Sequence, residues 1–213
     1  MQTTEKRNVG PFHGVDFRGV GRVILAPAEE ASVEVSAEQS VIERIVTEVR
    51  DGVLVVSIRW WFGLLFQAWH LRDLEVRLKV KDLRNLSLSG AGTVESDGRL
   101  GVEELDLRLS GAGRVALELQ GRKVRVRLSG AGSIELAGEV EEQELQLTGA
   151  GSIDAERLSS KRSRVRSSGA GECRLRVSDT LEAAISGAGS VLYRGSPRIE
   201  SRIRGVGRLE SLD

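Results

Sequence analysis

Cysteine and histidine are nearly absent from this sequence, which has one cysteine, Cys173, and two histidines, His13 and His70. A single cysteine cannot form an intramolecular disulfide, and so few sulfur and imidazole groups argue against a structural zinc site. Neither histidine has an acidic or serine partner at a recognisable spacing. We therefore expect no bound metal and no cofactor, and we interpret both histidines as structural or solvent-facing.

The sequence also lacks an excess of charge of either sign, because 31 basic residues balance 31 acidic ones. No global field steers such a chain toward nucleic acid, so we expect no nucleic-acid partner, although a local basic stripe is compatible with this balance. No run approaches the ~20 apolar residues that a membrane-spanning helix needs, so we expect no transmembrane segment. The first residues, MQTTEKRNVG, lack the apolar stretch of a secretory signal. Either the protein is cytoplasmic or its signal lies outside this chain.

Glycine, in contrast, is abundant and regularly placed. The motif LSGAG occurs three times and is followed by LTGAG, SSGAG, ISGAG and a final RGVGR. The first glycines of these motifs are Gly90, Gly111, Gly130, Gly149, Gly169, Gly187 and Gly205. Their successive spacings are 21, 19, 19, 20, 18 and 18 residues, and a fixed period of this length is typical of a solenoid.

Apolar and polar residues alternate on both sides of each glycine motif. The positions two and four residues before the glycine, and four after it, are mostly Leu, Val or Ile, whereas polar residues lie between them. A period of two on both sides predicts strand, turn and strand with one buried face. We therefore predict an all-β protein, a single-stranded right-handed parallel β-helix in which each coil covers the next. Cys173 occupies one of the apolar columns, so we interpret it as a core residue rather than a nucleophile.

We interpret the repeated glycines as the corners of this β-helix. A sharp bend between two strands often needs a positive φ or a close backbone approach, and a side chain there would collide with the neighbouring coils. A dinucleotide-binding loop must open a helix, whereas these motifs open another strand. Calcium-binding glycine repeats need an aspartate in each loop, but the residue after each motif is Thr, Arg, Ser or Glu.

The N-terminal third departs from the simple period. Ser36 to Gln39 fit a capping box and the apolar residues after them share a helical face, which predicts one short helix as far as about Val49. Asp51 and Gly52 then predict a turn into a strand over Val53 to Ile58.

The chain is predicted to be a single domain, 1–213, with an N-terminal part over 9–83 and the glycine-repeat coils over 84–213. The sequence RGVGR occurs near both ends, at Arg18 to Arg22 and at Arg204 to Arg208. Terminal repeats of a solenoid are commonly atypical, because one side has no neighbour. We therefore interpret both copies as terminal repeats.

Aromatic residues are scarce except in segment 59–71, RWWFGLLFQAWHL, which holds all three tryptophans and two of the four phenylalanines. One interpretation is a lid over one end of the β-helix, where strand edges and core would otherwise be exposed. A second is an oligomer or partner interface, because exposed tryptophan clusters are typical anchors, and a third is contact with a membrane surface or ligand. The interface interpretation concerns Trp60, Trp61, Phe62, Leu65, Phe66 and Trp69.

Two sets of charged residues fall on the predicted outward face. Glu135 and Asp154 share a position on consecutive coils, which brings their carboxyls near the ~5 Å separation of a retaining glycosidase pair. A solvated face is the commoner reason for such a pair, so we assign no catalytic residue. Arginines stack on the strand before the corner, as a solvated face or as a surface for an anionic glycan, and we expect the neighbouring Asp106, Glu144 and Glu182 to balance part of their charge. The arginines are Arg108, Arg125, Arg127, Arg164, Arg166 and Arg202.

The tandem LSGAG coils resemble a known family when they are taken with the blocks before them: NVGPFHGVDFRGVGRVIL, VEVSAEQSVIERIVTEVRDGVLVVSI and LEVRLKVKDLRNLSLSGAG. Together they closely resemble the head GIN domains of bacterial adhesins, from about Val9 to Leu212. The resemblance implies a β-helical domain that is periplasmic, outer-membrane-associated or extracellular, with an adhesive role toward a glycan or protein. It carries no catalytic residue to this chain.

Two functional hypotheses follow. The first is a non-catalytic module of the cell envelope or cell surface, which binds a glycan or protein and forms a homo-oligomer if segment 59–71 is an interface. The alternative is a carbohydrate-active enzyme, a polysaccharide hydrolase or lyase, on the same scaffold. The absence of a crowded acidic cleft favours the first, so we predict that the protein is not an enzyme.

Overall fold

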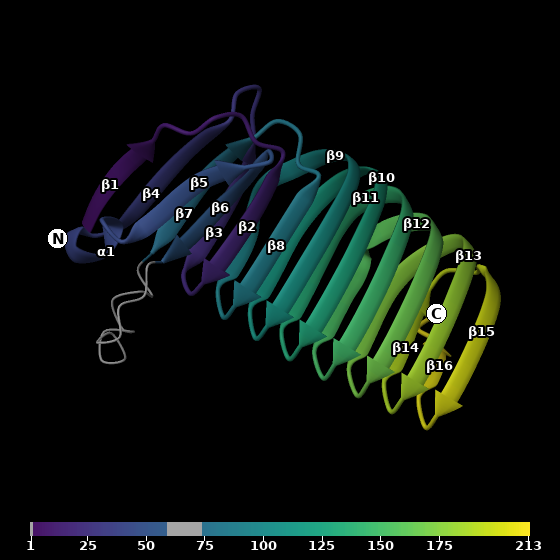
Figure 1. The fold of residues 1–213 in the computed structure, drawn as a ribbon. Helices are drawn as coiled ribbons and strands as arrows, with labels where there is room; N and C mark the ends of the chain where they lie inside the picture. Colours follow the sequence, from purple (N-terminus) through teal and green to yellow (C-terminus); the bar gives the residue numbers. More distant parts are fainter. Residues whose placement is uncertain (1, 59–73) are drawn as a thin grey trace.

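The computed structural model describes residues 2–58 and 74–213, and it confirms the predicted all-β fold. Coils stack along one axis into an elongated parallel β-helix, with the N-terminus at one end and the C-terminus at the other (Figure 1). The predicted short helix is present as α1 (Gln39–Ile42) in the N-terminal third. No helix in the described part of the chain is long and apolar enough to cross a membrane.

The strands fall into short N-terminal elements and long repeat elements. The short ones are β1 (Gln2–Arg7), β2 (Gly14–Gly19), β3 (Arg22–Pro27), β4 (Ser32–Glu38), β5 (Ile45–Arg50), β6 (Val53–Ile58), β7 (Glu75–Val80) and β8 (Asn85–Gly90). The repeat strands are β9 (Thr93–Gly111), β10 (Arg114–Gly130), β11 (Ser133–Gly149), β12 (Ser152–Gly169) and β13 (Glu172–Gly187). The chain ends with β14 (Ser190–Arg194), β15 (Arg198–Gly205) and β16 (Arg208–Ser211).

Each long strand runs from one glycine motif to the next and pairs in parallel with the strand of the following coil. Gly130 pairs with Gly111 on one side and with Gly149 on the other, so the motifs stack in register. The repeated glycines lie at the bends with φ between 103° and 122°. The Ala131 amide donates to the Gly111 carbonyl at 3.0 Å, which satisfies backbone groups that the bend would otherwise leave unpaired.

The core is the set of apolar columns that alternation predicts. Val115, Ile134 and Ile153 stack on successive coils and are at most 1% exposed. Cys173 continues this column between Ile153 and Val191 and is fully buried. Burial raises the pKa of the Cys173 thiol to about 12, with a further rise from the negative charge of Glu172. The thiol therefore stays protonated, as expected of a core residue.

The first RGVGR, Arg18 to Arg22, is not a terminal repeat, so that interpretation is wrong. Strand β2 pairs with β8 on one side and β6 on the other, while β3 pairs with β9 and β7. Gly19 thus stacks directly on Gly90, although the two are far apart in sequence. After β2 and β3, the chain forms a further coil from β6 and β7, which stacks on the outer side of the coil of β2 and β3. The second RGVGR does lie in the last described coil, between β15 and β16.

The strands β6 and β7 flank residues 59–73, as β2 and β3 flank the Gly19–Gly21 corner. Strands β6 and β7 thus occupy, in this outer coil, the places that β2 and β3 occupy beside the Gly19–Gly21 corner. The predicted interface residues Trp60, Trp61, Phe62, Leu65, Phe66 and Trp69, together with His70, lie outside the described residues. At the same end β4 pairs antiparallel with β1 and β7, and β5 pairs antiparallel with β6.

The predicted helix is much longer than the observed one, and its predicted start is wrong. Ser36 lies in β4, where its hydroxyl bonds to that of Thr4 at 2.8 Å, so it does not cap a helix. Helix α1 ends at Ile42, and the following residues form β5 against β6. Strand pairing with both neighbours outweighs local helix signals here, as tertiary context routinely does. The turn at Asp51 and Gly52, with φ of 50° and 74°, and the strand after it are confirmed.

Candidate functional site: the outward arginine face

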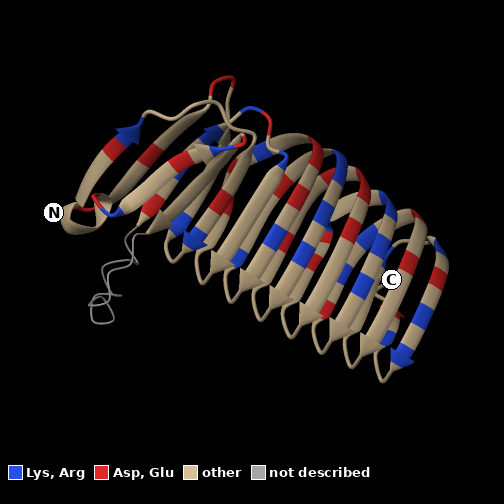
Figure 2. Ribbon diagram, in the orientation of Figure 1, with Lys and Arg blue, Asp and Glu red and all other residues tan. Residues whose placement is uncertain are grey.

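The strands that lead into the glycine corners present charged side chains outward in two adjacent columns. One column lies three residues before the corner glycine and the other five before it. Blue and red bands recur along these coils in Figure 2, because acidic and basic residues alternate from Asp106 to Glu182 in the second column, whereas the charged residues of the first column are arginines. The parallel register brings each side chain within reach of its counterparts on neighbouring coils, roughly 4.8 Å away.

Most of the arginines predicted for this face form ion pairs with carboxylates. Arg108 and Arg127 both bind Asp106, with N–O distances of 3.1 Å and 2.7 Å. Burial raises the pKa of Asp106, but the hydrogen bonds from the two arginines outweigh this effect and hold that pKa below its ordinary value. Arg125 lies 3.2 Å from Glu104, and Arg164 lies 2.8 Å from Glu182. Each of these four guanidinium groups therefore has a carboxylate within 3.2 Å, although Arg108 and Arg127 share that of Asp106.

The arginines toward the C-terminal end differ. The nearest carboxylate of Arg166 is that of Glu144 at 3.8 Å, beyond hydrogen-bond distance. Arg202 and Arg204 form no ion pair with any described residue. The uncompensated positive charge of the face is thus concentrated on β12 and β15, at one end of the predicted stripe.

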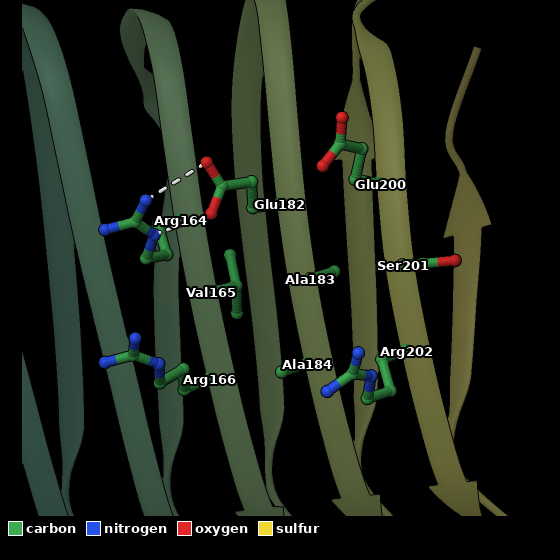
Figure 3. A pocket seen from close by; sticks show the side chains of 9 residues that line it. All are labelled: Arg164, Val165, Arg166, Glu182, Ala183, Ala184, Glu200, Ser201 and Arg202. Carbon is green, nitrogen blue, oxygen red and sulfur yellow. Dashed lines mark hydrogen bonds and ion pairs between the residues drawn. The ribbon is translucent and has the colours of Figure 1, made fainter.

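A hollow lies between Arg166 and Arg202, because the residue that separates them in the outward column is Ala184 (Figure 3). The hollow has a volume of about 480 Å³ and includes Glu182 and Glu200 at its edge. Glu182 is already engaged by Arg164. The methyl side chain of Ala184 is shorter than those of the two arginines beside it in the column. It therefore leaves space for a ligand between the guanidinium groups of Arg166 and Arg202.

A second hollow of about 350 Å³ adjoins the first and shares Arg166, Ala184 and Arg202 with it. Arg204, the hydroxyls of Ser168 and Ser186, and the amide of Gln146 line it. We call the two together the Ala184 hollow. Its lining is rich in hydrogen-bond donors and includes four guanidinium groups, those of Arg164, Arg166, Arg202 and Arg204. Guanidinium groups recognise carboxylate, sulfate or phosphate groups.

Glu135 and Asp154 do pair in register on neighbouring coils, as their spacing predicts. Glu135 is bound by Arg114 at 2.7 Å, and a carboxylate oxygen of Asp154 accepts the Glu156 amide at 3.0 Å. Neither carboxylate lines a hollow of the arginine face. Their surroundings are those of a solvated, ion-paired surface.

The remaining chemically notable residues form no site. His13 packs against the turn at Gly52, where a Cβ would lie 2.2 Å from its ring. In residues 2–58 and 74–213, no group of three or more His, Cys, Asp or Glu side chains is placed to hold a metal ion.

Sequence reasoning found Arg166 and Arg202 but missed what distinguishes them. The signal was present, because aligning the repeats puts Ala184 in a column that holds Arg or Gln on the four preceding coils and Arg on the next one. It also missed a buried polar cluster in which Gln143 and Ser163 both bond to the Ser160 hydroxyl, at 2.9 Å and 3.1 Å. This cluster lies inside the coil, away from the arginine face.

A parallel β-helix with a charged, solvent-facing ladder is a solenoid, a class of fold in which each repeat contacts only its neighbours. The chain belongs to the family described as "Putative auto-transporter adhesin, head GIN domain", which matches residues 11–197. The family and the neighbours below are named as adhesins or binding proteins, not as enzymes.

Solved structures share this fold over the full length of the chain. A putative adhesin from Bacteroides fragilis NCTC 9343 has a TM-score of 0.91 and 23% identity, over 100% of this chain and 97% of that chain. A putative adhesin from Parabacteroides merdae ATCC 43184 has a TM-score of 0.77 and 21% identity, over 100% and 96%. A putative lipid binding protein from Parabacteroides distasonis ATCC 8503 has a TM-score of 0.79 and 19% identity, over 100% and 97%. No curated protein matches the chain.

Proposed function

We propose that this chain is a non-catalytic binding module of the cell envelope or cell surface, which holds an anionic polysaccharide against the Ala184 hollow. The observation that supports this function is the pair Arg166 and Arg202, which flank Ala184 and lack a close carboxylate partner. Family membership supports an adhesive role in the periplasm, at the outer membrane or outside the cell.

The ligand class follows from the spacing of the charges. Equivalent side chains of a parallel β-helix recur at roughly 4.8 Å, so Arg166 and Arg202 are anchored roughly 9.6 Å apart, with Ala184 between them. A flexible polymer with regularly spaced carboxylates can lay successive groups on such a ladder. An isolated small anion would use only part of it, which makes a polyuronate a better fit than a free phosphate.

The geometry does not favour the enzyme alternative. The carboxylates best placed for a glycosidase pair, Glu135 and Asp154, are held by Arg114 and by the Glu156 amide. A glycosidase pair needs both carboxyl groups free to reach the scissile bond, whereas here each carboxylate is already engaged by a neighbouring group. We therefore assign the polysaccharide a role as ligand rather than substrate.

The test is equilibrium binding to immobilised polygalacturonate, with neutral dextran as the ligand control. The wild-type protein is expected to bind polygalacturonate only, and the double variant Arg166→Ala with Arg202→Ala to lose about tenfold or more in affinity. The matched control is Arg108→Ala with Arg127→Ala, which removes two arginines already held by Asp106. Equal binding to dextran, or equal loss in both double variants, would overturn the proposal. Release of reducing ends would favour the enzyme instead.

A further inference from the structure

We propose that two copies of this chain associate through their C-terminal coils, by antiparallel pairing of β15 with β15 of the second copy about a two-fold axis at Ser201. β15 pairs with β13 along one edge only, so its other edge carries unpaired amide and carbonyl groups. Such an edge is a ready template for another strand. The proposal rests on this edge alone and does not depend on the proposed ligand.

The inward face of β15 is apolar and uncovered. Ile199 and Ile203 pair with the buried Leu181 and Ile185 of β13 and continue their columns. They are nevertheless 39% and 43% exposed, because no coil lies beyond them, and Val206 at the corner is 84% exposed. These three are the exposed large hydrophobic residues of the described part of the chain. A second coil placed on β15 would bury them.

The opposite end of the β-helix is built differently. Its outermost strand β1 has the sequence QTTEKR, without an apolar residue, and pairs antiparallel with β4. The other outer strand, β5, carries an ion pair between Arg50 and Glu48 at 2.7 Å. Charged edges of this kind discourage strand addition. A head-to-tail contact would also propagate into a filament, whereas a contact between two C-terminal ends closes as a dimer.

The sequence of β15 is complementary to itself in one antiparallel register. With the two-fold axis at Ser201, Ile199 lies opposite the partner's Ile203, and Glu200 lies opposite the partner's Arg202. Apolar and opposite-charge cross-strand pairs are both stabilising. Arg198 faces the partner's Arg204 at the ends of the strand, as the one like-charged pair.

Registers centred on Glu200, on Arg202 or between two residues fail on charge or on side-chain direction. An axis at Glu200 puts two glutamates opposite each other, and an axis at Arg202 puts two arginines opposite each other. An axis between residues pairs an inward side chain with an outward one, because a one-residue slip exchanges the two faces. The Ser201 register keeps both isoleucines inside and matches Glu200 with a base along the full length of β15, whereas an axis at Ile199 matches Glu200 with Arg198 over only three residues of the strand. The Ser201 register gives Arg202 an acidic partner and leaves Arg204 without one.

The test is the molar mass of the wild-type chain in solution, measured by light scattering without ligand. We expect a dimer, a monomer for Ile203→Lys with unchanged circular dichroism, and a dimer for the control Thr4→Lys on β1 at the other end. Glu200→Arg and Arg202→Glu should each weaken the dimer, and the two together should restore it, because the pair is exchanged within one register. Ser201→Cys should form a disulfide-linked dimer on oxidation, because Ser201 faces its own copy, whereas Thr4→Cys should not.

A monomeric wild type would overturn the proposal, as would a charge-exchanged double variant that stays monomeric. A dimer that survives Ile203→Lys but is lost when residues 59–71 are replaced would place the contact in the aromatic segment and contradict it. Polygalacturonate binding is measured separately on the Ile203→Lys monomer. Loss of that binding would count against the proposed ligand but not against the dimer, so the two proposals can fail independently.

Discussion

The carbonyl oxygen of Gly111 lies 2.5 Å from the point where a Cβ on Gly130 would stand. The same closeness recurs up the stack, with Gly130 set against Gly149 at 2.5 Å. The corner therefore has no room for a side chain on either coil, and its positive φ of 117° at Gly130 disfavours one independently.

Gly130→Ala is therefore expected to lower the free energy of unfolding by about 1 to 3 kcal/mol or more, from backbone strain and the clash with Gly111. The matched control is Gly101→Ala in β9, where a Cβ would meet nothing within 4 Å. Urea unfolding of the two variants checks this. Equal stability of the two variants would show that the close corner does not limit the fold.

The register of the coils predicts opposite sensitivities at neighbouring positions. Ile153 is 1% exposed in the core column, so Ile153→Ala should lower the free energy of unfolding by about 2 to 5 kcal/mol. Glu135→Ala removes a half-buried side chain and a surface ion pair with Arg114, so its effect should stay within about 0.5 kcal/mol. Thermal denaturation of both variants compares them, and a larger loss for Glu135→Ala would mean that the strands are inside out.

Cys173 should be unreactive while the coil is intact. The thiol is fully buried, and burial raises its pKa to about 12, so it offers neither access nor thiolate. An aromatic disulfide reagent is expected to leave the native protein unmodified and to modify one thiol per chain after denaturation. Rapid modification of the native protein would contradict the placement of this column in the core.

Asp106 should make stability depend on pH in the acid range. Its pKa is lower in the folded state than the ~3.9 of a free aspartate, because Arg108 and Arg127 outweigh the effect of burial. The stability it contributes is fully present above about pH 4 and is lost as pH falls through the folded pKa. The variant Asp106→Asn should therefore be less stable than the wild type near neutral pH, and the stability difference between the two proteins should disappear in acid. A difference that persists in acid, measured by urea unfolding across pH, would contradict the ion-pair account.

The repeat part of this fold was predictable because two independent periods agree. Alternation fixes which side chains point inward, and the glycine spacing fixes where each coil turns, so columns such as Val115 over Ile134 follow from the sequence. The observed fold differs from the predicted one where the sequence does not follow these two periods. The outer coil of β6 and β7 was missed because pairing between distant segments has no local signal.

Local signals also misled where pairing competes with them. Ser36 has the pattern of a capping residue, yet its hydroxyl bonds to Thr4 across two strands. The cluster around Ser160 lies in β12, where the pairing register shifts between Ala155 and Ser159 and again between Ser160 and Arg162. Fixed-period alignment fails at such bulges.

The arginines of this face and the carboxylates beside them were predictable from the sequence, but which arginine each carboxylate binds was not. Spacing alone puts Arg108 and Arg166 in the same column. Which of them is held by a carboxylate depends on side-chain geometry, and this decides which arginine is available to a ligand. Ala184 contributes to the hollow because its side chain is short, and not through any chemical group that binds a ligand.

The measurement that tests the binding account most directly is the affinity for polygalacturonate as a function of salt concentration. If uncompensated arginines hold the polymer, the logarithm of the affinity falls with the logarithm of salt, because each bound anionic group releases counterions. The slope should be shallower for Arg166→Ala with Arg202→Ala and unchanged for Arg108→Ala with Arg127→Ala. An affinity that does not change with salt, or one slope for all three proteins, would contradict the account.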